Sequence, residues 1–251
     1  MEDRMDLIFD LHCHFNHGVP GDTEESEIYR TDLAFLQEEH RQANITACGM
    51  SSFSSVLSDA HIYEENAYTA EIAQKEQWIY QWVVVDPRKP ELYRQAEELL
   101  KLEKTLGIKI HSPCHGYPIA EYADELFAFA SAHHATMLMH PDAIPEMPAF
   151  ANKYPDMRLI IAHLGSTEHV DAIADAVHGN IYTDTSGNAS SRNNVLEYAV
   201  SKIGSEKILF GTDTYASGFQ VGRVQYARIT QEDKRNIFYE NARRLFPQIR
   251  L

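Results

Sequence analysis

Two histidines separated by one residue, His12 and His14, close a short apolar run near the start of the sequence. Side chains alternate between the two faces of a β-strand, so a strand here would point both imidazoles to one face and Cys13 to the other. Two neutral imidazoles on one face suit zinc, iron, nickel or cobalt, and the geometry excludes Cys13 from the same ion. We interpret Cys13 as a small buried hydrophobic residue. In a chain with 13 histidines, such a pair also arises by chance.

Three further polar residues follow later apolar runs in the same way, namely His140, His163 and Asp213. In a barrel of parallel strands, the C-terminal strand ends meet at one mouth, where catalytic groups collect. Taken singly, a histidine in such a place is commonly a core residue bonded to a carbonyl. Recurrence at four strand ends instead predicts one shared metal site.

Eight short apolar runs are the elements that would position these side chains. Successive runs begin about 20 to 40 residues apart, which is roughly one strand, one helix and two loops. The alternation predicts an α/β fold, a (β/α)8 TIM barrel, as a single domain over residues 1–251. The predicted strands are residues 7–11, 45–48, 78–85, 107–110, 136–139, 158–162, 180–184 and 207–210.

The intervals between the runs carry helix signals. Pro90 suits a first helical position, and Gly107 is expected to supply a left-handed cap after that helix. Residues 230–233 resemble a capping box and predict a helix near the end of the chain. The serine-rich residues 51–58 predict a loop after the second strand.

The chain carries 22 basic and 37 acidic side chains, a formal charge of -15. Nucleic-acid binders need basic surfaces, so the charge disfavours DNA, RNA and anionic membranes, and we expect a small-molecule substrate. The apolar runs are too short for membrane helices, and the N-terminus lacks the regions of a signal peptide. The three cysteines lie far apart and suggest neither disulfides nor a thiolate zinc site, which fits the cytoplasm. A homo-oligomer is compatible with the sequence.

Five motifs in a fixed order resemble the metal-dependent amidohydrolase superfamily, and more closely its amidohydrolase-related group of barrel hydrolases and decarboxylases. They are Asp10 to His14, Gly107 to His111, His140 to Asp142, Ile161 to Gly165 and Gly211 to Asp213. Residues 85–87 and 241–246 also match, so the resemblance covers nearly the whole chain.

The resemblance implies a set of site residues. His12, His14, His140 and Asp213 would bind a divalent metal ion, with zinc as the first choice, as one ion or two. His163 would bind a second ion or act in catalysis.

Lys109 and His111 share a face of the fourth run, so both can point into the barrel, and we assign them to substrate binding. In some superfamily members, a lysine here is carboxylated and bridges two metals, whereas others have a glutamate and the decarboxylase-like members use one metal without a bridge. Deep burial would favour the neutral amine that reacts with carbon dioxide. Nearer the mouth, an ammonium would hold a substrate carboxylate, and a structural ion pair is the third option.

Loops on the predicted active face add weaker candidates for substrate contact: His17, His115, Tyr117, Arg192, Tyr215 and Arg223. An arginine there can clamp a carboxylate through two hydrogen bonds, although solvated loop arginines are commoner. Structural roles are expected for the histidines before the fifth run or in helical segments: His40, His133, His134, His169 and His178.

These assignments predict a metal-dependent hydrolase that cleaves a small-molecule amide, lactone or ester-like bond with metal-activated water. Asp213 would take a proton from water and return it to the leaving group, while His163 orients the water or polarises the carbonyl. The first alternative is a decarboxylase of an aromatic or enol acid at the same site. A barrel nuclease is disfavoured by the charge and the missing glutamate, and a catalytically inactive binding barrel by the intact ligands.

Overall fold

The computed structural model describes residues 7–16 and 30–250. Eight strands pair side by side in chain order, and every pair is parallel. The strands are β1 (Phe9–Phe15), β2 (Ala47–Ser52), β3 (Ile79–Val84), β4 (Thr105–His111), β5 (Thr136–His140), β6 (Arg158–Ile161), β7 (Ile181–Asp184) and β8 (Ile208–Leu209).

Hydrogen bonds between β1 and the end of β8 bring the first and last strands together. Leu11 N donates to Phe210 O at 2.9 Å, and Thr212 N donates to His12 O at 3.2 Å. The sheet is therefore a nearly closed barrel, and the predicted (β/α)8 fold is confirmed. Both β1 and β2 begin two residues later and end four residues later than predicted, so His12 lies inside its strand.

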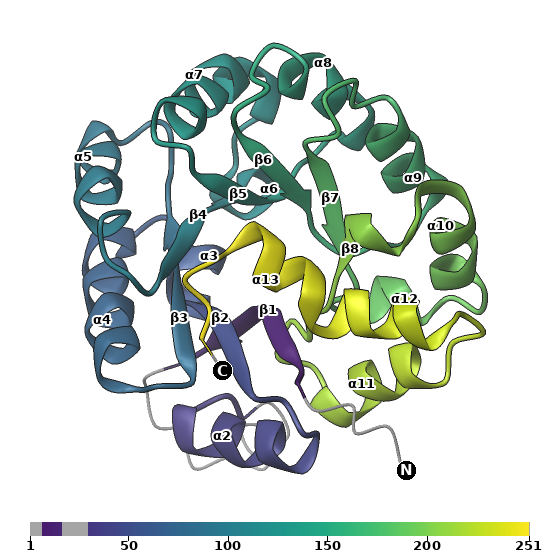
Figure 1. Ribbon diagram of the computed structural model, residues 1–251. Helices are drawn as coiled ribbons and strands as arrows, with labels where there is room; N and C mark the ends of the chain where they lie inside the picture. The colour runs from purple at the N-terminus through teal and green to yellow at the C-terminus, as the bar shows by residue number, and fades with distance from the viewer. Residues whose placement is uncertain (1–6, 17–29, 251) are drawn as a thin grey trace.

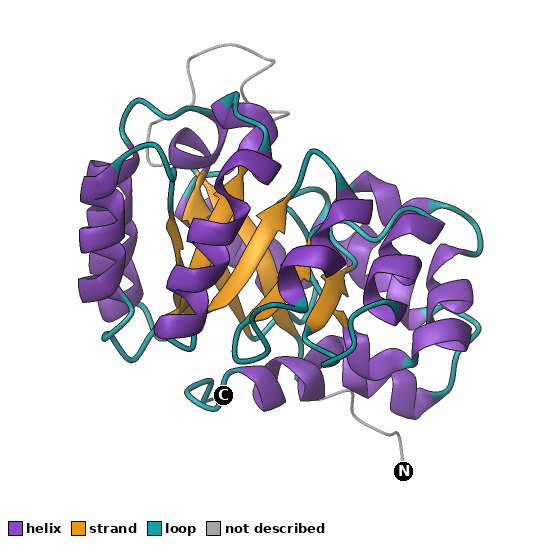
Figure 2. Cartoon of the chain, turned by 90° about the horizontal axis from the view of Figure 1, so that it is seen from above, coloured by secondary structure: helices purple, strands orange, loops and turns teal. Residues whose placement is uncertain are grey.

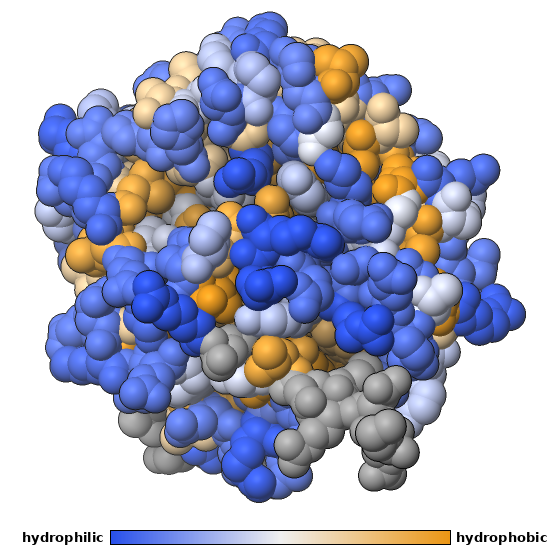
Figure 3. All heavy atoms as spheres, in the orientation of Figure 1, coloured by the Kyte–Doolittle hydropathy of each residue, from blue (hydrophilic) through white to orange (hydrophobic). Residues whose placement is uncertain are grey.

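Helices connect the strands and enclose the barrel (Figures 1 and 2). None of the helices in the described ranges is long and apolar enough to cross a membrane. The face of the molecule in Figure 3 is largely hydrophilic. The helices are α2 (Leu33–Gln42), α3 (Phe53–Leu57), α4 (Ile62–Lys75), α5 (Pro90–Leu99), α6 (Ser112–His115), α7 (Ile119–Ala132), η1 (Ile144–Glu146), α8 (Met147–Ala151), α9 (Thr167–Ala174), η2 (Asn188–Ser191), α10 (Val195–Ile203), η3 (Ser205–Lys207), α11 (Ser217–Gln225), α12 (Gln231–Arg235), η4 (Asn236–Glu240) and α13 (Asn241–Leu245).

The end of the chain covers the N-terminal end of the barrel, where α13 crosses the ring of strands in Figure 1. The Phe246 ring packs edge-on against Trp82 of β3, with centroids 5.7 Å apart. Phe9 and Leu106, near the starts of β1 and β4, belong to the same buried cluster. The opposite end, where the strands terminate, is therefore the end at which polar side chains can meet a ligand.

Gly107 does not cap α5, contrary to the sequence-based expectation. The helix ends at Leu99, and Leu100 still has right-handed helical angles. Gly107 instead lies within β4, where an added Cβ would stand only 2.0 Å from the carbonyl oxygen of Thr136. Glycine is needed here because the backbones of β4 and β5 approach too closely to leave room for a side chain.

Residues 51–58 are not a loop, which is a second correction. Ser52 ends β2 and caps α3, because its hydroxyl accepts a hydrogen bond from Ser55 N at 3.2 Å. Serine is a favoured N-cap residue, so a serine-rich segment can start a helix as readily as it forms a loop. The predicted capping box is present at α12, between Thr230 and Asp233.

An irregularity in β1 decides where its polar side chains point. The pairing of β1 with β2 shifts between Asp10 and Cys13, as in a β-bulge. The Leu11 carbonyl accepts a hydrogen bond from Trp82 Nε1 at 2.7 Å. His12 consequently faces the barrel interior beside Leu11, whereas Asp10 and Cys13 face the surrounding helices.

Candidate metal centre

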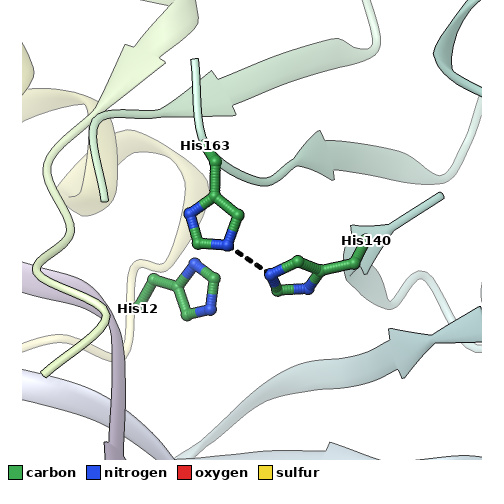
Figure 4. Close-up of side chains that lie close together, drawn as sticks. All are labelled: His12, His140 and His163. Atoms are coloured by element: carbon green, nitrogen blue, oxygen red, sulfur yellow. Dashed lines mark hydrogen bonds between the residues drawn. The ribbon is translucent and has the colours of Figure 1, made fainter. Parts of the chain in front are cut away.

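Five side chains meet at the C-terminal ends of the strands: His12 and His14 of β1, His140 of β5, His163 after β6 and Asp213 after β8. They form two groups that share His12. One group adds His14 and Asp213, and the other adds His140 and His163; in each, the donor atoms lie within 4.8 Å of one another. Figure 4 shows the three imidazoles of the second group converging.

In the first group, the Nε2 atoms of His12 and His14 are 3.2 Å apart. Asp213 Oδ1 lies 3.6 Å from His12 Nε2 and 3.3 Å from His14 Nε2. The Nδ1 atom of His14 donates to the Ser51 carbonyl oxygen at 3.2 Å, and His12 Nδ1 donates to Asp184 Oδ2 at 2.9 Å. Each ring therefore keeps a lone pair on Nε2.

Two nitrogen lone pairs and a carboxylate oxygen repel one another when no cation lies between them. The carboxylate on Nδ1 of His12 is also the usual partner of a metal-binding imidazole. The residues of the first group therefore fit a divalent metal ion.

In the second group, the Nε2 atoms of His140 and His163 are 2.5 Å apart. His163 Nδ1 donates to the Ser186 carbonyl oxygen at 3.1 Å, so its Nε2 also carries a lone pair. Asp213 connects the two groups, because its Oδ2 lies 3.8 Å from His163 Nε2 while its Oδ1 faces the first group. The donor atoms suit one ion or two.

The backbone at the centre is held in unusual conformations. His163 and Asp213 have φ angles of 65° and 56°, values that are uncommon for residues other than glycine. Gly187 packs between them: an added Cβ would lie 3.0 Å from His163 Nδ1 and 3.3 Å from Asp213 Oδ2. Such strain collects at functional sites, where the surrounding structure holds it.

Burial sets the charge state of the centre. It lowers the pKa of His12 to about 3, with a further contribution from the Lys109 cation, and it lowers the pKa of His14 and His140 as well. Burial alone would raise the pKa of Asp213, but its contacts with His14, His12 and His163 hold the pKa below its usual value. At neutral pH these groups are thus neutral imidazoles and a carboxylate, the forms that bind metal.

Sequence analysis missed Asp184, the last residue of β7. Its Oδ2 accepts the proton of His12 Nδ1, and its Oδ1 accepts hydrogen bonds from the backbone N–H groups of His163 at 3.1 Å and Ser186 at 2.9 Å. The carboxylate thereby orients two site histidines. The signal was present, because an acidic residue closes the predicted seventh strand.

The two candidates of β4 lie at different depths. Lys109 is completely buried, and its Nζ is 2.6 Å from His12 Nε2. Burial lowers its pKa to about 7. The His12 lone pair can bind a metal ion or accept this hydrogen bond, but not both. His111 lies nearer the mouth, and its ring stacks on His140 with centroids 4.1 Å apart.

Three of the weaker candidates have structural partners away from the metal centre. His115 Nε2 bonds a backbone carbonyl of α3 at 3.0 Å. The Tyr117 ring is buried beneath the Arg88 guanidinium, 5.1 Å away. Arg223 pairs with Glu197 at 2.9 Å.

The other weaker candidates differ in position. Arg192 is exposed, with Nη1 3.0 Å from a Cβ added at Gly165. Tyr215 lines a cavity beside the centre, and His17 lies outside the described residues. Among the helical histidines, His169 bonds a backbone carbonyl at 3.1 Å, as expected of a core residue.

A cavity of about 570 Å³ opens beside the first group. Thr214 and Tyr215, which follow Asp213, form one side, and Phe53 and Phe35 contribute aromatic rings to the lining. The Phe53 ring centroid is 4.9 Å from that of His14. The volume falls within the range of small-molecule sites, about 300–1,000 Å³.

Comparison with known families decides the classification. The family model described as amidohydrolase matches residues 9–248. The chain belongs to the amidohydrolase family. This confirms the resemblance of its five motifs and makes the chain a metal-dependent enzyme, as hydrolases and decarboxylases of this family are. A search of the curated proteins gave no match.

Several solved structures share this fold and align with nearly the whole length of the chain. A dihydroxybenzoic acid decarboxylase from a Polaromonas species, with bound manganese and the inhibitor 2-nitroresorcinol, is 18% identical with a TM-score of 0.77, covering 98% of each chain. A 5-carboxyvanillate decarboxylase from Sphingomonas paucimobilis is 14% identical with a TM-score of 0.76, covering 96% of this chain and 99% of its own. An amidohydrolase from Burkholderia multivorans with bound zinc is 16% identical with a TM-score of 0.73 and the same coverage.

Proposed function

We propose that this amidohydrolase-family enzyme is a metal-dependent decarboxylase of a small aromatic carboxylic acid. The observation that carries the proposal is the aromatic cavity beside His14 and Asp213, in which Phe53 and Phe35 can pack against a ring. The decarboxylases of dihydroxybenzoic acid and 5-carboxyvanillate share the fold at full length and act on ring acids of this kind.

His12, His14, His140 and Asp213 would hold the divalent ion, zinc being the first choice. When bound, such an ion supplies a Lewis acid that withdraws electrons from the oxygen atoms of the substrate. Loss of carbon dioxide leaves an electron pair on the ring carbon, and a proton must replace the carboxyl group. His163 faces Asp213 across 3.8 Å at the partly exposed side of the cluster, so we assign delivery of that proton to this pair.

The test is product analysis with a panel of hydroxylated benzoic acids in the zinc- and manganese-loaded enzyme. We expect one carbon dioxide released per acid consumed and, in D₂O, one deuterium on the ring carbon that carried the carboxylate. His163→Gln should keep the metal and lose this activity. Arg223→Lys serves as the control, because the Arg223 guanidinium pairs with Glu197 and the Ser190 carbonyl rather than with a donor of the centre. A panel that is left intact while esters or lactones are cleaved would reject the proposal.

Hydrolysis by activated water, the first expectation from the sequence, is the second candidate. It is favoured by the exposure of Asp213 and His163, whose side chains are 17% and 23% accessible while His12 is 1% accessible. Water can therefore reach the pair that would remove its proton. Incorporation of ¹⁸O from labelled water into the product of an amide, lactone or ester would identify this chemistry.

We also propose a role for Lys109 below the metal rather than against the substrate. Its complete burial and its pKa of about 7 favour the neutral amine, which reacts with carbon dioxide and loses a proton to form a carbamate. This modification belongs with two ions and therefore with the hydrolytic candidate, since the one-ion decarboxylase needs no bridge. His111, stacked on His140 nearer the mouth, then stays as the substrate contact of β4. A carbamate resonance in ¹³C spectra after loading with labelled bicarbonate, absent in Lys109→Met, is the expected result. No such resonance in the metal-loaded wild type would refute it.

A further inference from the structure

A second cluster of potential metal ligands lies on the outer face of β1. A carboxylate oxygen of Asp10, the thiol of Cys13 and an imidazole nitrogen of His40 lie within 4.8 Å of one another. His40, from α2, places Nε2 3.4 Å from Asp10 Oδ2 and 3.9 Å from Cys13 Sγ. All three side chains are buried, with relative exposures of 0%, 1% and 2% for Asp10, Cys13 and His40.

The distances between these donor atoms distinguish a metal site from an ordinary hydrogen bond. A hydrogen bond from an imidazole N–H to a carboxylate is about 2.7–3.2 Å long, so 3.4 Å between His40 and Asp10 is too long for a good one. Ligand atoms on a tetrahedral zinc ion stand about 3.3–3.8 Å apart, as follows from Zn–N, Zn–O and Zn–S lengths of about 2.0–2.3 Å. The observed 3.4 and 3.9 Å are close to these edges.

Cys48 of β2 lies next to this group of three donors, although its thiol is not part of the group. The register of β1 and β2 pairs Asp10 with Cys48, and the Cys48 thiol donates to the Trp78 carbonyl oxygen at 3.8 Å. Cys13 and Cys48 are both free. A thiolate, an imidazole and a carboxylate are all zinc ligands, and a closed four-coordinate site needs one more, which Cys48 would supply after its side chain turns away from the Trp78 carbonyl. Sequence spacing gave no sign of it, because the fold alone brings residues 13 and 48 together.

The surroundings support a cation at this place. Thr212 fixes the Asp10 carboxylate, donating its hydroxyl to Oδ2 at 2.6 Å and its backbone N–H to Oδ1 at 3.0 Å. Carboxylate ligands are commonly oriented in this way. A surface cavity of about 400 Å³ between α2 and Trp78 is lined by His40 and offers an access route.

We propose that Asp10, Cys13, His40 and Cys48 bind a structural zinc ion between the barrel and α2, distinct from the active-site metal. The ion would brace the segment that carries Asp213. Thr212 bonds Asp10, as described above, and the Thr214 hydroxyl lies 3.4 Å from Cys13 Sγ. The outer site therefore stands directly behind the inner one, with β1 between them. This proposal does not depend on which reaction the enzyme catalyses.

Cobalt substitution tests the proposal without an activity assay. The inner donor groups contain no thiol, so absorption from thiolate-to-cobalt charge transfer reports the outer site alone. We expect this band in the cobalt-loaded wild type and in His12→Ala/His14→Ala, in which the inner site is disabled. It should be lost in Cys13→Ser and in His40→Gln. Cys114→Ser, which changes the exposed cysteine, is the matched control and should keep the band.

Metal content gives the second measurement. Zinc per chain should fall by one ion in His40→Gln, and X-ray absorption at the zinc edge should show sulfur ligands in the wild type. A wild-type protein without the cobalt band and without sulfur at zinc overturns the proposal, leaving an ion pair between His40 and Asp10. Because both decisive spectra are recorded on the wild type, a variant that fails to fold does not remove the test.

Discussion

Alanine at Gly187 should disturb the metal centre through both the backbone and a direct contact. Gly187 has φ 68° and ψ -175°, a backbone region that is essentially restricted to glycine. The added Cβ would lie 3.0 Å from His163 Nδ1 and 3.3 Å from Asp213 Oδ2. The substitution therefore combines backbone strain with direct pressure on two site residues.

The expected magnitude follows from these two effects. Backbone strain of this kind costs about 1–3 kcal/mol. The imidazole of His163 must also shift by a few tenths of an ångström, which weakens its bond to the Ser186 carbonyl and adds about 1 kcal/mol. We expect a loss of about 2–4 kcal/mol in the free energy of unfolding. Metal affinity should fall about 10–100-fold, as it does when groups that orient ligands are lost.

Gly116→Ala is the matched control. Gly116 also has a positive φ, 72°, but an added Cβ meets no atom within 4 Å. The Gly116→Ala variant should lose only about 1–2 kcal/mol in the free energy of unfolding, because alanine is disfavoured in the left-handed conformation, and its metal affinity should be unchanged. Urea unfolding and competition with a chelator measure the two quantities without a substrate. Equal losses of stability in the two variants, with unchanged metal affinity in both, would refute the contact argument.

Three further predictions concern the ligands and their protonation. His12→Ala or His14→Ala should remove the metal of the inner site, lowering the metal content by at least one ion per chain relative to the wild type, while circular dichroism stays unchanged because the packed barrel interior lies below the mouth. An unchanged metal content in either variant would contradict the ligand assignment. Asp213→Asn should retain much of the metal through the imidazoles, but its turnover should fall about 10²-fold or more. Unchanged turnover would mean that His163 alone transfers the proton. In the metal-free protein, the free energy of unfolding should fall as pH drops from 7 towards 4. His12 and His111 have folded-state pKa values of about 3, so in this range they bind protons only after unfolding. A flat pH profile in urea unfolding would contradict this.

The features that the sequence predicted well all depend on local periodicity. Apolar runs of strand length, repeated eight times with helices between them, leave few topologies other than the barrel. Alternation along β1 then puts His12 and His14 on one face, and parallel strands bring His140, His163 and Asp213 to the same end. The predicted ends of the strands were less accurate, because the position at which a strand ends depends on pairing with its neighbours rather than on the local sequence pattern.

Other features depend on contacts that no local pattern encodes. The depth of Lys109 follows from the register of β4 against β3 and β5, in which it pairs with Val84 and Leu138. Asp184 was overlooked because its role lies in the bond to His12, which is 172 residues away in the chain. Gly107 was misread as a helix cap because the carbonyl that requires a glycine there belongs to another strand.

The bulge in β1 explains how one strand can contribute to two clusters at once. Strict alternation would direct Asp10, His12 and His14 to the same face, and Asp10 would then compete for the inner metal. The extra residue between Asp10 and Cys13 reverses that order, so Asp10 joins Cys13 on the outer face while both histidines stay inside. The Leu11 carbonyl, held by Trp82, fixes the bulge from the barrel interior. Loss of that indole N–H, as in Trp82→Phe, should therefore alter both metal contents together, whereas changes to His40 or to the inner histidines should alter only one.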